Sequence, residues 1–172
     1  MHRLSSERLT LRMVEQKDAE FILELYNSED FLRFVGDKGI HTVGDAQLYI
    51  QNNILAMHEE HKVCLMLVES SDTKEKLGVC GLIKRPELTA YDIGYGFMPA
   101  VYGQGYGYEA GQTVIEYARQ QPEIDELVAI TTSDNGASQA LLTKLGFTYV
   151  KVQDAISDTV DLLLYQMSLH SE

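Results

Sequence analysis

The residues with the clearest chemical potential are three alternating glycines, Gly103, Gly105 and Gly107, which follow an apolar stretch and precede a helical pattern. Glycine lets backbone N–H groups turn outward and approach a ligand closely. The first N–H groups of a helix have no intrahelical partner, and the helix dipole adds partial positive charge there. The segment therefore predicts an anion site made of main-chain amides, and a simple turn is the alternative. The other residues of this loop are Gln104, Tyr106 and Tyr108.

Two common phosphate-binding motifs do not fit this loop. A Walker loop requires Gly-Lys followed by Ser or Thr, and the loop contains no lysine. A dinucleotide-binding motif has the spacing G-x-G-x-x-G within repeated strand–helix–strand units, whereas the spacing here is G-x-G-x-G. The phosphate ligand, if there is one, belongs to another class.

A second group of polar residues opens a later helix. Asn135, Ser138 and Leu142 are spaced so that they share one helix face, directly after an apolar stretch that reads as a strand. Asn is also a common helix N-cap, and Ser138 is an ordinary polar residue of a first turn, so structural roles are the alternative at both positions.

The elements that must position these residues follow from hydrophobic periodicity. Helices are expected over 18–26, with Asp18 as the N-cap, over 45–59, from the glycine loop to about 120, and over 135–145, where Gly146 ends the helix. A short apolar piece spans 31–35. Strands are expected over 9–13, 63–69, 77–83, 90–98, 127–132, 147–152 and 159–169. Helices alternate with strands only in the middle of the chain, which favours a mixed sheet over a doubly wound one.

Composition limits the class of protein. The 172 residues and 45% hydrophobic content fit one globular domain over 1–172. Asp and Glu outnumber Lys and Arg by 26 to 14, a formal charge of −12, which argues against nucleic acid or an anionic membrane as partner. The charge suits a cationic partner, or it serves solubility alone.

The sequence also argues against a membrane-spanning, a secreted and a metal-binding protein. The longest apolar run, 63–68, is far shorter than the roughly 20 residues of a membrane span, and the first residues contain no secretory signal, so a cytoplasmic protein is expected. Cys64 and Cys80 lie in apolar stretches and read as buried free thiols. No metal site is predicted, because no ligand spacing relates the histidines His2, His41, His58, His61 and His170.

Together, the two motifs resemble the GNAT N-acetyltransferase superfamily. Its phosphate-loop pattern, Q/R-x-x-G-x-G/A, falls on 102–107, with Tyr102 departing from the usual first residue. Its pattern N-x-x-S/A, then six residues of any type, then L-G-F, falls on 135–147 without a gap. The opening Glu7–Arg12 and the segment Asp92–Tyr95 resemble the ribosomal-protein N-acetyltransferase branch in particular. The resemblance covers nearly the whole chain.

The resemblance implies a mixed α/β fold of the GNAT type. The sheet is expected to be twisted and mostly antiparallel, with helices on both faces and a splayed parallel pair formed by 90–98 and 127–132. Acetyl-CoA, the co-substrate, would lie in the splay without any metal. Its pyrophosphate would lie on Gly103–Tyr108, and its pantetheine would bind the strand edge near Phe97 and Met98. Its adenine or 3′-phosphate would meet Lys144, for which a solvated surface lysine is the alternative.

The resemblance also suggests catalytic roles. Many relatives carry a tyrosine seven residues after the asparagine, where this chain has Leu142, so Ser138 is the candidate for a hydrogen bond to the leaving thiolate. Asn135 would bind the cofactor or order a water molecule. Asp92 is the candidate base, provided that burial raises its pKa, and a salt-bridge residue is the alternative.

The expected function is direct transfer of acetyl from acetyl-CoA to a primary amine, such as the N-terminus of a basic ribosomal protein. A polyamine or an aminoglycoside is an alternative acceptor. A CoA-binding module without turnover and a nucleotide-binding protein are the alternative functions. The acceptor is expected near 31–57 and 154–158, and the protein is expected to be a monomer or a homodimer.

Overall fold

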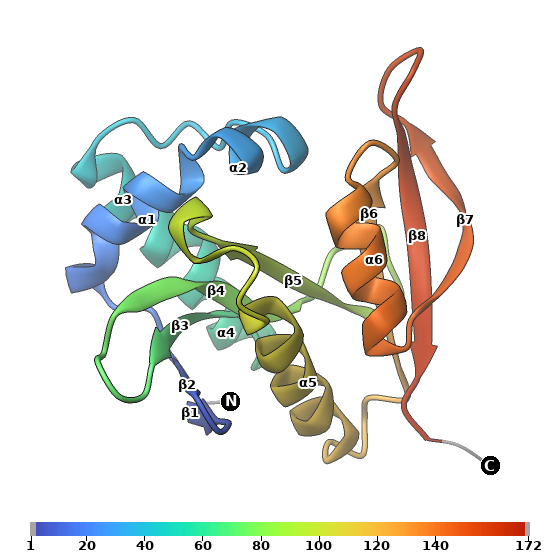
Figure 1. Ribbon diagram of the computed structural model, residues 1–172, viewed down its shortest axis with the longest axis horizontal. Coiled ribbons are helices and arrows are strands. Elements are labelled where there is room, and N and C mark those ends of the chain that lie inside the picture. Colours follow the sequence, from blue (N-terminus) through green and yellow to red (C-terminus); the bar gives the residue numbers. More distant parts are fainter. Residues whose placement is uncertain (1–2, 171–172) are drawn as a thin grey trace.

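The computed structural model describes residues 3–170, which form an eight-stranded sheet flanked by helices (Figure 1). The strand order is β1-β2-β3-β4-β5-β6-β8-β7, and β5 and β6 are the one parallel pair within the described chain. The strands are β1 (Arg3–Ser5), β2 (Leu9–Arg12), β3 (Leu65–Ser70), β4 (Lys76–Ile83), β5 (Tyr91–Phe97), β6 (Glu126–Thr132), β7 (Thr148–Ala155) and β8 (Asp161–Ser168). The predicted mostly antiparallel sheet is confirmed; β1 was not predicted.

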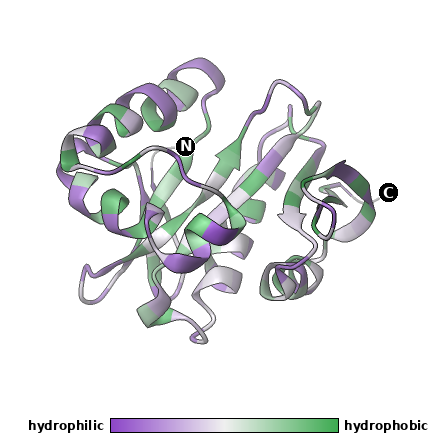
Figure 2. Cartoon of the chain, turned by 90° about the horizontal axis from the view of Figure 1, so that it is seen from above, coloured by the Kyte–Doolittle hydropathy of each residue, from purple (hydrophilic) through white to green (hydrophobic). Residues whose placement is uncertain are grey.

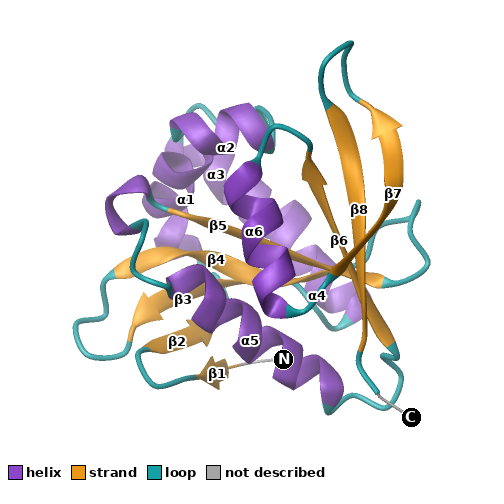
Figure 3. Cartoon of the chain, turned by 45° about the vertical axis from the view of Figure 1, so that its right-hand side comes forward, coloured by secondary structure: helices purple, strands orange, loops and turns teal. Residues whose placement is uncertain are grey.

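Helices lie on both faces of the sheet, as predicted (Figure 3). They are α1 (Ala19–Tyr26), α2 (Glu29–Phe34), α3 (Val43–Tyr49), a π-helical segment (Ile50–Leu55), α4 (Ala56–His61), α5 (Tyr106–Arg119) and α6 (Gly136–Leu145). Short 3₁₀ turns occupy Gln16–Asp18 and Pro99–Val101. The single helix expected over 45–59 is thus α3, the π segment and α4 in succession. It begins earlier because Thr42 Oγ1 accepts the Asp45 N–H at 3.0 Å in a capping box.

Two apolar cores separate the helices by face. The core on the α5 and α6 side includes Val114, Leu127 and Leu142, whereas the core on the opposite side includes Ile22 and Leu67. Figure 2 shows largely hydrophobic central strands and outer helices banded with hydrophilic residues, as expected for helices that bury one face.

Both cysteines are buried free thiols, as predicted. Burial raises the pKa of Cys64 to about 11 and that of Cys80 to about 12. Both therefore remain protonated and unreactive near neutral pH.

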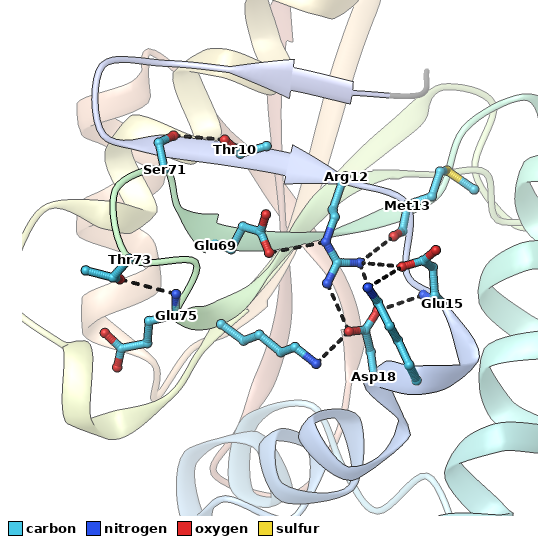
Figure 4. A network of polar contacts seen from close by, with 11 residues as sticks. Thr10, Arg12, Met13, Glu15, Asp18, Glu69, Ser71, Thr73 and Glu75 are labelled. Carbon is cyan, nitrogen blue, oxygen red and sulfur yellow. Dashed lines mark hydrogen bonds and ion pairs between the residues drawn. The ribbon is translucent and has the colours of Figure 1, made fainter.

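The start of α1 is held by a buried ion network rather than by a side-chain cap (Figure 4). Asp18 makes no capping hydrogen bond to α1. Its carboxylate accepts hydrogen bonds from Arg12 Nη1 and Nη2 at 2.9 and 3.0 Å and forms an ion pair with Lys76 Nζ at 2.7 Å. Arg12 Nε also donates a hydrogen bond to Glu69 at 3.2 Å. Asp18 occupies the predicted N-cap position of α1, but its side chain does not bond to the amides of that helix. Its carboxylate is directed to the two cations and to the backbone N–H of Glu15, at 2.8 Å, in the preceding turn.

The parallel pair positions the site. β5 and β6 pair only at Tyr91–Leu127 and Asp92–Val128, although β5 continues to Phe97 and β6 to Thr132. Beyond Asp92 the two strands diverge (Figure 3), which is the predicted splay. The diverging strands leave backbone groups of β5 available to a ligand.

Within residues 3–170, no helix combines the length and apolar character needed to cross a bilayer. Over the same range, no three His, Cys, Asp or Glu side chains gather as a metal-ligand set, and His2 lies outside the described residues.

Candidate active site

The glycine loop presents the start of α5 without a side-chain cap. Gly103 and Gly105 adopt φ angles of 78° and 82°, a left-handed conformation that favours glycine. Gly105 occupies the N-cap position and has no side chain to accept a hydrogen bond. The N–H groups of residues 106–108 therefore have neither an intrahelical acceptor nor a side-chain cap, and they can bind an anionic diphosphate together with the positive end of the helix dipole.

A carboxylate in the first turn of α5 is neutralised by the first hairpin. Glu109 accepts Arg8 Nε at 2.6 Å and the Arg8 backbone N–H at 2.8 Å, and Ser6 Oγ also donates to it. Burial opposes the ionised form, but the hydrogen bonds from Ser6 and Arg8 lower the pKa of Glu109. The Arg8 guanidinium also lies over the Tyr106 ring, 4.7 Å from its centroid.

Sequence reasoning did not assign Arg8 a role at this site. The one signal was the Glu7–Arg12 opening, whose contact with α5 cannot be read from the sequence.

A cavity of about 570 Å³ begins at the glycine loop and extends to α2. It is lined from α2 by Asp30, Phe31 and Phe34, with Ser28 and Val35 beside that helix; from β5 by Tyr95, Gly96 and Phe97; from the loop and α5 by Val101, Tyr102, Gly103, Gly105, Tyr106, Gly107 and Tyr108; and from α6 and its cap by Asn135, Gly136, Ala137, Ser138, Leu141 and Lys144. Of the predicted site residues, Asp92, Met98 and Gln104 are not among those that line it.

A second hollow of about 690 Å³ lies on the other side of Gly105, between residues 4–8 and α5. It does not include Ser138 or any residue of β5. It therefore does not connect the glycine loop with the splay, and the cavity that extends to α2 is the candidate site.

Ser138 is paired across the cavity with Tyr95 of β5, their oxygens 2.7 Å apart. Burial raises the pKa of Tyr95 to about 12, so its hydroxyl stays protonated at neutral pH. Asn135 Oδ1 accepts the Ser138 N–H at 3.1 Å, which makes Asn135 the N-cap of α6. The sequence did not distinguish Tyr95 from the other tyrosines nearby, although strand alternation places it on the α6 side of β5.

The backbone of β5 offers its free groups at Tyr95 and Phe97. The Met98 N–H donates to the Leu77 carbonyl of β4 at 2.9 Å and is therefore already paired. In an antiparallel pair successive residues point their N–H and C=O groups alternately toward and away from the partner strand. The backbone groups of Tyr95 and Phe97 thus point away from β4 into the splay, where a ligand amide can pair with them.

Asp92 is the last residue of β5 that pairs with β6, and it is buried, with 1% of its surface exposed. Arg85 Nε donates to its Oδ2 at 2.9 Å, whereas Oδ1 is buried without a hydrogen-bond partner. Burial raises the pKa of Asp92, and Arg85 opposes this rise only in part. By alternation the side chain faces away from Tyr95, on the α1–α4 side of the sheet.

Lys144 marks the glycine-loop end of the cavity. Its ammonium lies 4.4 Å from the centroid of the Tyr108 ring, a cation–π geometry. The group is therefore placed beside the loop that can bind phosphate.

Comparison with known proteins agrees with this geometry. A family model described as an acetyltransferase (GNAT) domain matches residues 8–148. The chain belongs to the GNAT acetyltransferase family. It is 29% identical over 146 residues to the uncharacterized N-acetyltransferase YoaA of Bacillus subtilis (strain 168), covering 84% of this chain and 81% of YoaA.

Solved structures show the same fold. The ribosomal L7/L12 alpha-N-protein acetyltransferase RimL, in complex with coenzyme A, superposes with a TM-score of 0.85 at 20% identity, over 97% of this chain and 98% of RimL. The microcin C7 self-immunity acetyltransferase MccE, in complex with acetyl-CoA and AMP, superposes with a TM-score of 0.80 at 20% identity, over 95% and 93% of the chains. The predicted enzyme class, an acetyl-CoA-dependent N-acetyltransferase, is confirmed by family membership.

Proposed function

We propose that this acetyltransferase moves the acetyl group of acetyl-CoA directly onto a primary amine that enters the cavity from the α2 side. One observation carries the proposal: the uncapped start of α5 opens into the cavity that holds the Tyr95–Ser138 pair and reaches α2. A diphosphate on the glycine loop and an amine at the other end would meet between β5 and β6. Holding both reactants in one cavity supplies much of the rate enhancement.

The reaction needs two proton movements. The new N–C bond forms as the C–S bond breaks, one proton leaves the amine, and one proton reaches the sulfur. Ser138 Oγ would donate its proton to the sulfur while accepting a hydrogen bond from the Tyr95 hydroxyl, 2.7 Å away, and would regain a proton from water. Because Tyr95 stays protonated, it keeps the Ser138 proton directed toward the leaving group.

The base is proposed to be Asp92, acting through water. Its unpartnered Oδ1 is a free acceptor, and its raised pKa makes it a better base than an exposed aspartate. Its burial and its orientation away from Tyr95 exclude direct contact with an amine that sits beside Ser138.

The acceptor is proposed to be a protein N-terminus on a basic partner. The formal charge of −12 favours association with a cationic body, and RimL, a structural neighbour, acts on a ribosomal protein by its name. A small cationic amine and a CoA-binding module without turnover are the competing functions.

The test combines CoA binding with turnover. Purified protein is titrated with CoA by calorimetry and then given acetyl-CoA with a panel of amines, while thiol release is followed. Release that depends on the amine supports the proposal. Tight CoA binding without turnover of any amine would favour the module, and stabilisation by ATP or NAD but not by CoA would favour a nucleotide-binding protein.

A further inference from the structure

Few of the carboxylates that make the chain acidic line the cavity. The formal charge is −12, yet among the described residues that line the cavity Asp30 is the sole carboxylate and Lys144 the sole ammonium. Lys144 lies over Tyr108 at the glycine-loop end. The α2 end is therefore left with a single formal charge, that of Asp30.

The wall at the α2 end is apolar and held in place. Phe31 stacks on Tyr26 with ring centroids 4.1 Å apart and lies against Gly96 of β5, where an added Cβ would approach the Phe31 ring to 3.4 Å. Phe34 and Val35 extend this wall, and Val35 is 48% exposed. An apolar substituent placed here is removed from water, which is favourable.

Asp30 influences Tyr102, the residue before the glycine loop. Partial burial and the Asp30 carboxylate together raise the pKa of Tyr102 to about 12. Tyr102 is the residue that departs from the Gln or Arg of the family's loop pattern. Tyr102 therefore adds no positive charge at this end of the cavity.

The one arginine of α2 forms an ion pair with an aspartate beside the cavity. Arg33 lies 3.7 Å from Asp134, in the turn before α6, and it is not among the cavity-lining residues. The Arg33 guanidinium also lies over the ring of Phe34, 4.7 Å from its centroid, so it stands beside the wall with Asp134 as its ion-pair partner. An acceptor carboxylate entering at α2 would therefore meet Asp30 and apolar side chains, and the cation beside them is already paired.

We propose that the α2 end of the cavity selects a primary amine with a single positive charge, an apolar substituent and no free carboxylate. This inference rests on the proposed function and narrows its acceptor. Asp30 can pair with the single ammonium of the acceptor as it enters, before that amine loses its proton and reaches Ser138. A second ammonium would lose its hydration here without a second carboxylate to pair with, and a free carboxylate would be repelled by Asp30. An N-terminal residue with an apolar side chain and a simple alkyl or aryl amine both have this chemistry, whereas a polyamine and an aminoglycoside do not.

The test measures acceptor preference with the full chain and acetyl-CoA. Leucinamide is compared with free leucine, which adds a carboxylate, and with spermidine, which adds charges. We expect kcat/KM for leucinamide to exceed both by about tenfold or more, since an unpaired charge in the cavity is penalised. A peptide that begins with Leu and phenylethylamine separate the two sources: faster turnover of the peptide assigns a polypeptide N-terminus, and faster turnover of phenylethylamine assigns a small amine.

Two variants test the role of the carboxylate. Asp30→Asn is expected to raise KM for leucinamide about tenfold while leaving CoA affinity unchanged. The matched control is Asp72→Asn, the same change at an exposed position in the β3–β4 loop, which should change neither value.

The outcomes separate this inference from the proposed function. If CoA binds and spermidine or free leucine is used as well as leucinamide, or Asp30→Asn behaves like Asp72→Asn, the inference is overturned and the acetyltransferase proposal stands. If CoA binds but no amine turns over, the binding of leucinamide to the CoA complex is measured by calorimetry. Failure of leucinamide to bind overturns the inference. If CoA does not bind, both fall.

Discussion

The Tyr95–Ser138 pair allows the proposed thiolate partner to be tested by a double-mutant cycle. Ser138→Ala leaves the Tyr95 hydroxyl, 2.7 Å from the deleted oxygen, without its partner. Because the hydroxyl lines the cavity and water can reach it, the lower end of the usual cost applies, about 1 kcal/mol. For a chain of this length that corresponds to a fall in Tm of about 2–4 °C. Tyr95→Phe combined with Ser138→Ala removes both hydroxyls and should recover part of this loss.

The catalytic effect is larger and follows a different pattern. Loss of proton donation to the leaving sulfur is expected to lower kcat of Ser138→Ala about 100-fold, the lower end for general acid catalysis. Tyr95→Phe, which only orients Ser138, should lower kcat about tenfold. The double variant should be no slower than Ser138→Ala, since the two residues act as one unit.

The assay follows thiol release with saturating acetyl-CoA, with CoA affinity measured in parallel. Tyr149→Phe is the matched control, because Tyr149 is exposed on β7 and outside the cavity, and it should change neither Tm nor kcat. The reasoning is refuted if kcat of Ser138→Ala stays within twofold of the parent, or if the two single effects multiply in the double variant.

Three further variants test the cradle and the scaffold. Arg8→Ala should weaken CoA binding, most at low salt, because it leaves the negative charge of Glu109 less neutralised beside the proposed phosphate site. An unchanged Kd for CoA would contradict this, as would a Kd that does not recover when Glu109→Gln is added. Asp18→Asn should lower the free energy of unfolding at pH 7 by about 2 kcal/mol, because burial would raise the pKa of Asp18 but Arg12 and its other partners hold it at about 2. The parent should lose this stability as the pH falls from about 4 through 2, whereas the variant should lack that step in urea unfolding; equal pH profiles would refute it. Gly103→Ala should lower the free energy of unfolding by about 1 kcal/mol and weaken CoA binding. The reason is the φ of 78°, which is strained for alanine although no atom lies within 4 Å of an added Cβ. An unchanged Tm would show that the loop adapts.

The sequence predicts the helices and strands where their position depends on neighbouring residues. Alternation and helical spacing located most strands and helices, and the glycine spacing located the start of α5. Helical spacing predicts a helix that starts at Asp45, whereas Asp45 is the third residue of α3 and forms a capping box with Thr42. The partners of Asp18 are not local: it occupies the predicted N-cap position, but its carboxylate is held by Arg12 and Lys76 from two strands.

The sequence by itself determined the uncapped glycine turn at the start of α5, because the φ angles of glycines and the free amides of a helix start depend only on neighbouring residues. It also placed Asn135 and Ser138 on one helix face. Only the tertiary structure decided which groups meet there: Tyr95 contacts Ser138 across 43 residues, and Arg8 contacts Glu109 across 101. It likewise decided where the charge lies. Net charge sums over the whole surface, whereas the field inside a cavity depends on the few side chains that the fold turns inward.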